Sequence, residues 1–111
     1  TFQKLNPYKL GHPGKPIAIV QGGLTGSSGE VVVIAFIGLP NARSFGQPTY
    51  GVTTTVTNFE LRDGAYLNMV NGYSADRNRK KYNGPVIPDV ETQDRDSAIA
   101  AATRWIIEST K

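Results

Sequence analysis

The sequence predicts one α/β domain, or part of one, with a small mixed sheet, a β-hairpin and a C-terminal helix. Three observations support this prediction. The apolar run Ile17–Val20 is bounded by Pro16 and by Gly22-Gly23, which is typical of a short buried strand in a parallel sheet. The stretch 53–73 has the pattern of a hairpin. Toward the C-terminus, apolar side chains recur at helical spacing, at Ile99, Ala102, Trp105 and Ile106.

Length and composition fit a soluble globular domain. The chain has 111 residues, of which 39% are hydrophobic and 19% charged. No apolar run approaches the roughly 18 residues that span a bilayer. The N-terminus has neither the apolar core of a signal peptide nor an initiator methionine. We therefore expect no membrane span, and we expect the chain to be a processed product or a piece of a longer protein.

The charged and metal-binding residue types exclude several kinds of site. The formal net charge is +3, but the cations are dispersed except at Arg77–Lys81, which is typical of a solvated basic loop. We therefore expect no nucleic-acid partner. The sequence contains no cysteine and one histidine, so disulfides, thiolate chemistry and a structural zinc site are excluded. We expect neither a cofactor nor a metal.

The run Glu30–Ile37 permits two interpretations. Its β-branched residues favour a strand. A helix is favoured by Ser27 or Ser28 as an N-cap, by the acidic residue that opens the run, and by the stop signal of Gly38 and Pro40. A helix that is apolar all round is expected to be buried on all sides.

The remaining elements follow from turn residues and spacing. Residues 1–15 contain several prolines and glycines and are expected to be an irregular lead-in. Phe45–Thr49 is expected to be a short strand. In the hairpin we expect the three-residue loop 62–64, because this register pairs Phe59 with Leu67 and Thr57 with Met69. It places these apolar residues on one face: Phe59, Leu61, Leu67 and Met69.

A polar loop and a short segment connect the hairpin to the last helix. The loop is expected over 76–85 and the segment over 86–90. Asp94 or Asp96 is expected to cap the helix, because aspartate is a favoured N-cap residue. Trp105 lies on the apolar side of this helix, so we expect it to anchor the core.

Ser27 is the first candidate for chemistry. It lies in the glycine-rich segment 23–30, directly after the predicted strand. If a helix follows, small neighbours allow a substrate carbonyl to approach, and free N–H groups at the helix start, including that of Ser28, are suited to hold an oxyanion. The alternative interpretation is an ordinary glycine-serine turn whose serine caps the helix.

Four motifs in order resemble the C-terminal-processing (tail-specific) serine peptidase family. The family has a small-residue run that ends in Ser-x-x-Glu, a Gly-Glu-Pro-Thr-aromatic-Gly strand and turn, a Leu-Ser-Asp-Gly hairpin, and a Gly-Ile-x-Pro-Asp element. The corresponding segments here are Thr25–Glu30, Gly46–Gly51, Leu61–Gly64 and Gly84–Asp89. The resemblance spans nearly the whole chain from about residue 6.

This resemblance implies a fold, an activity and a compartment. Residues 1–111 would form the C-terminal part of the catalytic domain, a Clp-protease/crotonase-like half-domain. Ser27 would be the nucleophile of a serine endopeptidase, and the Ser28 N–H would help to hold the oxyanion. The substrate would be a peptide or an unfolded protein, in an extracytoplasmic compartment. The partners of the nucleophile would lie in an N-terminal part of the same chain.

The general base is where the sequence departs from the best-known members of the family. Those members use a lysine two places after the aromatic residue of the turn, and here Val52 stands at that place. A branch of the family shares this departure. His12 is expected to be a solvent-exposed loop residue, and Lys80 and Lys81 are adjacent cations that lack the burial needed to lower a lysine pKa. Glu30 is expected to be a first-turn helix residue rather than an acid catalyst.

Asp76, Arg77 and Tyr82 resemble a stretch of the same branch. Two interpretations are open, a role in lining the site and a structural loop, and we expect the structural loop. The lost lysine also fits a second hypothesis, a binding module for peptides or other ligands without hydrolysis. A third hypothesis is a structural half-domain that stabilises a larger chain or self-associates through exposed strand edges.

Overall fold

A computed structural model describes residues 9–111, so the first eight residues of the predicted lead-in lie outside the described part of the chain. Residues 9–16 contain no helix or strand. The elements that follow are β1 (Ile17–Gln21), α1 (Ser28–Phe36), β2 (Ala42–Gly46), β3 (Thr54–Glu60), β4 (Tyr66–Ala75), β5 (Lys81–Tyr82), β6 (Val90–Glu91) and α2 (Arg95–Ser109). The prediction of a mixed α/β fold is confirmed.

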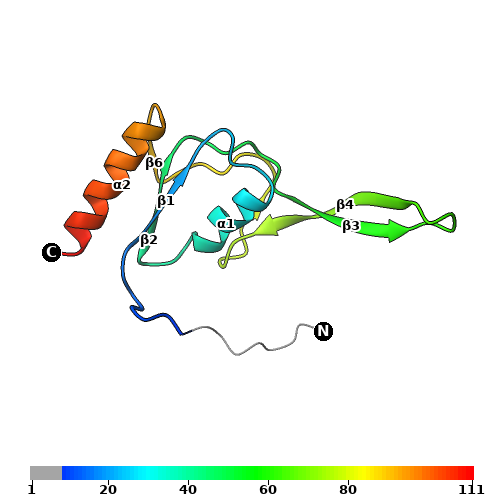
Figure 1. Cartoon of the computed structure of the whole chain (residues 1–111), viewed down its shortest axis with the longest axis horizontal. Coiled ribbons are helices and arrows are strands. Elements are labelled where there is room, and N and C mark those ends of the chain that lie inside the picture. Colours follow the sequence, from blue (N-terminus) through cyan, green and yellow to red (C-terminus); the bar gives the residue numbers. More distant parts are fainter. Residues whose placement is uncertain (1–8) are drawn as a thin grey trace.

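A three-stranded parallel sheet lies between the two helices. Its order is β1-β2-β6, with Val20 of β1 paired with Phe45 of β2. Ile19 packs against the buried side chains of α1, whereas its neighbour Ala18 packs against those of α2. Because successive residues of a strand point to opposite faces, α1 and α2 cover opposite faces of the sheet (Figure 1).

The ambiguous run 30–37 is helical over most of its length. Ser27 is the N-cap, and the helix stops before Gly38, which has φ of 83° and so takes the left-handed conformation that glycine tolerates. The expectation of burial on all sides was wrong. The valines at 31 and 32 are more than half exposed, because only one side of α1 packs against the sheet.

The predicted strand Phe45–Thr49 is displaced. The observed strand β2 ends at Gly46, where φ is 131° and a Cβ would lie 1.9 Å from the carbonyl oxygen of Gln21. This close contact requires glycine, and it turns the chain out of the sheet. The N–H of Gln47 then donates to the same Gln21 oxygen at 3.2 Å.

The second sheet is antiparallel, in the order β3-β4-β5. The predicted hairpin register is confirmed, with Phe59 opposite Leu67 and Thr57 opposite Met69. The N–H of Leu61 donates to the Ala65 carbonyl at 2.8 Å, across the predicted three-residue loop. This hairpin extends away from the parallel sheet as an arm (Figure 1). Its predicted apolar face is about half exposed.

The C-terminal helix α2 is fixed at its first turn and along one side. Asp94 is the N-cap, since its carboxylate accepts from the Ser97 N–H at 2.8 Å. Trp105 is partly buried and its ring centroid lies 5.9 Å from that of Phe45, so its predicted core role is confirmed. Neither helix in residues 9–111 is long and apolar enough to cross a membrane.

Candidate functional site

Ser27 lies at a sharp turn between β1 and α1, in a conformation that side chains other than glycine rarely adopt. Its φ is 52° and its ψ is −116°. Within residues 9–111 the only other non-glycine residue with positive φ is Arg79. Such a conformation costs on the order of 1–3 kcal/mol and persists only where surrounding contacts impose it. A strained serine at a strand-to-helix turn is the geometry that exposes a nucleophilic hydroxyl.

The hydroxyl of Ser27 is free to react, although the residue occupies the N-cap position. Ser27 and Glu30 occupy the two positions of a capping box, in which the Ser27 N–H donates to the Glu30 carboxylate at 2.8 Å, but the Ser27 hydroxyl has no resolved cap hydrogen bond of its own and the residue is exposed. An ordinary serine cap uses its hydroxyl to accept from the first helical turn. Ser27 therefore departs from the capping interpretation that the sequence also allowed.

Glu30 holds this turn from inside the protein. Its side chain is 0% exposed. One carboxylate oxygen accepts from the Ser27 N–H at 2.8 Å, and the other accepts from the Thr49 hydroxyl at 2.5 Å and the Gly51 N–H at 2.6 Å. One side chain thus ties the turn at Ser27 to the loop after β2. Glu30 is more than the first-turn helix residue expected from the sequence.

The same hydrogen bonds keep Glu30 ionised. Burial alone would raise the pKa of its carboxyl, but the bonds from Thr49 and from the backbone N–H groups of Gly51, Ser27 and Val52 outweigh it and lower the pKa. A buried carboxylate with these donors is a fixed negative charge, which is unsuited to proton transfer near neutral pH. The expectation that Glu30 is not an acid catalyst agrees with this geometry.

Three further hydrogen bonds position the glycine-rich loop. The Thr25 N–H donates to the Gly22 carbonyl at 2.8 Å, while the Thr25 hydroxyl accepts from the Gly22 N–H at 3.1 Å. The Tyr50 N–H donates to the Thr25 carbonyl at 2.8 Å. The loop 22–27 is therefore clamped to the turn 49–51 on both sides of Gly26.

Ser28 is the first residue of α1 and is exposed. The N–H groups of the two residues after it, Gly29 and Glu30, donate to the carbonyls of Gly26 and Ser27 at 3.0 Å. An N–H at the first position of a helix has no intrahelical acceptor. In the described part of the chain the Ser28 N–H is therefore the donor beside Ser27 that remains available to a ligand.

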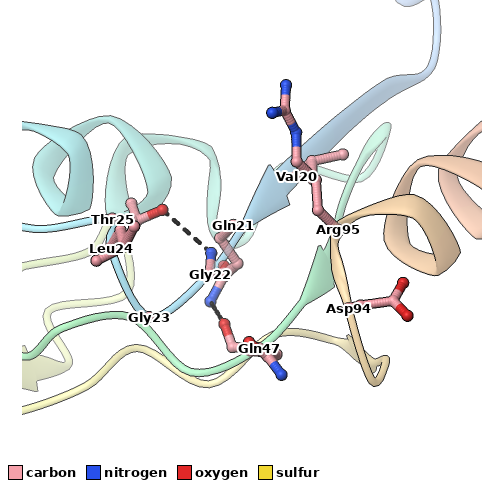
Figure 2. A pocket seen from close by; sticks show the side chains of 9 residues that line it. All are labelled: Val20, Gln21, Gly22, Gly23, Leu24, Thr25, Gln47, Asp94 and Arg95. Atoms are coloured by element: carbon pink, nitrogen blue, oxygen red, sulfur yellow. Dashed lines mark hydrogen bonds between the residues drawn. The ribbon is translucent and has the colours of Figure 1, made fainter.

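A cavity of about 410 Å³ opens beside the glycine-rich loop. Figure 2 shows the residues that line it, which come from the end of β1, the glycine-rich loop, the residue after β2 and the start of α2. Gln21 is 5% exposed and donates to the carbonyls of Gln47 at 3.1 Å and Val86 at 2.7 Å. Leu24, at the rim, is 98% exposed.

Within residues 9–111, none of the side chains considered as a general base forms a hydrogen bond with the Ser27 hydroxyl. His12 is exposed in the segment before β1. Lys80 and Lys81 are also exposed, and the Lys80 ammonium lies 5.4 Å from the ring centre of Tyr82. Val52 follows the clamped turn and carries no proton acceptor. Within residues 9–111 the structure therefore brings Ser27, Ser28 and Glu30 together, and it gives none of the candidate bases a hydrogen bond to Ser27.

Arg77 and its neighbours lie at the C-terminal end of α1. The Arg77 guanidinium donates to the carbonyls of Ala35 at 2.7 Å and Ile37 at 3.0 Å, which lie in and just after the last turn of α1. Asp76 accepts from the hydroxyl of Tyr82 at 2.8 Å. Burial and that bond raise the pKa of Tyr82 to about 12, so it stays a donor. These residues are structural, as expected.

Sequence reasoning missed Thr49, Gly51 and Gln21 as residues that shape the site. Thr49 and Gly51 lie inside a segment that the sequence singled out, but their bonds to Glu30 join residues 19 and 21 positions apart. No local pattern records such a contact. Within the described residues, no cluster of three or more His, Asp or Glu side chains is arranged to hold a metal ion.

Comparison with known proteins gives consistent matches. The model of peptidase family S41 matches residues 3–92. The nisin-resistance protein of Lactococcus lactis subsp. lactis is 35% identical over 92 residues, which cover 82% of this chain and 28% of that protein. A lipoprotein from Streptococcus agalactiae aligns with a TM-score of 0.74 and 40% identity, over 84% of this chain and 32% of that one. The chain thus spans about a third or less of these relatives.

Proposed function

The chain belongs to peptidase family S41, and we propose that it is the nucleophile-bearing part of a serine endopeptidase of the tail-specific type. In this proposal the Ser27 oxygen attacks the carbonyl carbon of a peptide bond. An ester forms between Ser27 and the acyl half, and the amine half leaves with a proton. Water then hydrolyses the ester and restores the serine.

The observation that carries this proposal is the strained backbone of Ser27. A serine that only capped a helix would need no positive φ and would use its hydroxyl in the cap. Here the hydroxyl is exposed and uncommitted, and a buried carboxylate holds the turn. The Ser28 N–H, at the positive end of the α1 dipole, is suited to stabilise the oxyanion that forms during the attack.

The rest of a longer protein would supply the base and complete the site. Support comes from the short span that the chain covers in its relatives and from an uncovered apolar face. That face is formed by β1 and α2 around a shallow pocket of about 280 Å³, lined by Ala18, Val20, Ile99, Ala102, Thr103, Ile106 and Ile107. An extracytoplasmic site of action is supported by the match to a lipoprotein.

A serine-directed phosphonate tests the proposed nucleophile. We expect the full-length protein to be labelled at Ser27, as located by peptide mass spectrometry, and to lose the label in Ser27→Ala. Ser28→Ala is the matched control, because it removes the neighbouring hydroxyl but keeps the proposed oxyanion N–H. The isolated 111-residue chain is expected not to cleave unfolded protein. Cleavage by that piece would show that its base is present after all.

A second candidate function is a peptide- or ligand-binding module without hydrolysis. It is favoured by Val52, which stands where the family's usual base would be, and by the exposure of His12, Lys80 and Lys81. This function predicts that the full-length protein binds peptide but is not labelled by the phosphonate. Labelling that depends on Ser27 would eliminate it.

A further inference from the structure

The outer edge of strand β3 is an unpaired row of backbone donors and acceptors. β3 is an edge strand, and no strand within residues 9–111 pairs with its outer side. Natural proteins blunt such edges with charges, prolines or bulges, because an open edge pairs with other chains. β3 contains no proline, its one charged residue is Glu60 at its last position, and its one irregularity lies between Thr55 and Val56.

The hairpin register identifies the backbone groups that face outward. Leu61 donates to Ala65, so this pair is of the hydrogen-bonded kind. Hydrogen-bonded and non-hydrogen-bonded pairs alternate along an antiparallel ladder. Asn58, which lies opposite Asn68, is therefore in a non-hydrogen-bonded pair, and its N–H and C=O point away from β4. Val56 and Glu60 are also in non-hydrogen-bonded pairs, so their N–H and C=O groups point away from β4 as well.

The inner end of this edge lies at the candidate active site. β3 begins three residues after Gly51, whose N–H shares the Glu30 carboxylate with the Ser27 N–H. The outer edge of β4 has no such connection, because β5 pairs with β4 at Ser74 and Ala75 near the base of the hairpin. A chain laid along β3 toward its first residue would thus approach the turn that is tied to Ser27 through Glu30, whereas one laid along β4 would meet β5.

We propose that the outer edge of β3 binds the substrate as an added extended strand. This inference rests on the proposed peptidase function and names how its substrate is held. Backbone hydrogen bonds between β3 and the peptide would give affinity that does not depend on the peptide's sequence. Alternate side chains of the peptide would determine which sequences bind best. In an added strand, every second side chain of the substrate would lie beside the half-exposed apolar face of the hairpin. The favoured substrate is therefore an extended peptide with apolar side chains at alternate positions.

Two proline substitutions form a matched test. Asn58→Pro removes an N–H from the outer edge of β3, and Asn68→Pro removes the N–H directly across the ladder, which faces the other edge. Both would be made in full-length Ser27→Ala protein, which cannot turn over its ligand. The probe is a fluorescein-labelled ten-residue peptide of alternating leucine and serine, and the readout is its Kd from fluorescence anisotropy.

Asn58→Pro is expected to weaken binding about fivefold or more, since one net hydrogen bond is lost and the ring obstructs the edge. Asn68→Pro and Asn58→Ala, which keeps the N–H, are expected to leave the Kd within about twofold. Methylation of alternate amide nitrogens of the peptide is expected to abolish binding. Circular dichroism verifies that each variant is folded. If Asn58→Pro unfolds, the comparison of methylated and unmethylated peptide on the Ser27→Ala protein becomes the test.

Equal Kd values for the two proline variants, or binding of the methylated peptide, would overturn the proposal, as would an absence of binding. If Asn58→Pro only converted dimers to monomers in sedimentation, with an unchanged Kd, the edge would serve a second copy of the chain instead. Phosphonate labelling of Ser27 is independent of all these results. Failure of the strand-addition proposal is therefore distinguishable from failure of the peptidase proposal.

Discussion

At the scale of single residues, the strain at Ser27 has a measurable consequence. Glycine adopts positive φ without a steric penalty, so Ser27→Gly removes the strain that Ser27→Ala retains. Although both variants lose the hydroxyl, Ser27→Gly is expected to be the more stable by about 1 kcal/mol. Urea unfolding of the two variants measures this difference.

The adjacent residue provides the control for this comparison. Ser28 has ordinary helical geometry, so Ser28→Gly is expected to be less stable than Ser28→Ala by up to about 1 kcal/mol. The order of stability should therefore reverse between neighbouring positions. The same order at both positions would mean that Ser27 is not strained.

Glu30 predicts a specific loss of stability in acid. Its pKa is lowered in the folded protein from an ordinary value of 4.5, so its contribution to stability is fully present above pH 4.5. That contribution is lost as the pH falls through the lowered pKa. We expect the free energy of unfolding, measured with urea at a series of pH values, to fall in this window.

Glu30→Gln separates this carboxylate from others that titrate nearby. The NH₂ group of the new amide would face a donor in either orientation, the Ser27 N–H in one and the Thr49 hydroxyl and Gly51 N–H in the other. The free energy of unfolding at neutral pH should therefore fall by about 1–3 kcal/mol. The variant should then show less of the loss below pH 4.5. A parallel pH dependence in both proteins would assign it to other groups, such as Asp76 or Asp94, whose pKa values are also lowered.

At the scale of elements, helix α1 depends on contacts at both ends. Arg77→Ala removes two charge-assisted hydrogen bonds to the last carbonyls of α1 and a cation at the negative end of its dipole. We expect a loss of about 1–3 kcal/mol in thermal or urea unfolding. Arg79→Ala is the control, because it changes the same charge nearby without a hydrogen bond to α1. Equal effects would indicate a general charge effect.

The elements also show what the sequence was able to predict. The hairpin register was predictable because a turn glycine and four apolar residues constrain it locally. The helix α1 was ambiguous, because β-branched residues favour a strand while the caps favour a helix. Its true state is decided by packing on the sheet. The end of β2 was mispredicted because the approach of Gly46 to Gln21 joins residues that are distant in sequence.

The candidate site follows the same division. Ser27 and Ser28 were identified from a local motif at a strand-to-helix turn. The role of Glu30 depends on Thr49 and Gly51, and that of Arg77 depends on the end of α1, so neither contact is written in a local pattern. The sequence therefore located the strand-to-helix turn that carries Ser27, but not the contacts that hold it.

At the scale of the whole molecule, the apolar face of β1 and α2 gives a further prediction. Ile107 on that face is 55% exposed, and Ile87 elsewhere is 63% exposed. In the isolated chain, serine at either position should change the melting temperature little. In the full-length protein, Ile107→Ser should cost about 1–2 kcal/mol if the remaining chain covers this face, while Ile87→Ser should not. Thermal unfolding of all four proteins distinguishes these outcomes.

The start of α1 is held by the bonds of Glu30 to Thr49 and Gly51, and its end by the bonds of Arg77. These contacts also determine when Ser27 acquires its geometry during synthesis. Ser27 is translated before Gly51, and about fifty residues before Arg77, an interval of roughly 3–10 s at ordinary elongation rates. Until those residues emerge, neither end of the helix is fixed, and nothing compels Ser27 into its strained conformation. A nascent chain would therefore carry an unstrained Ser27, and the strained form would appear only after the turn 49–51 and Arg77 have joined the fold.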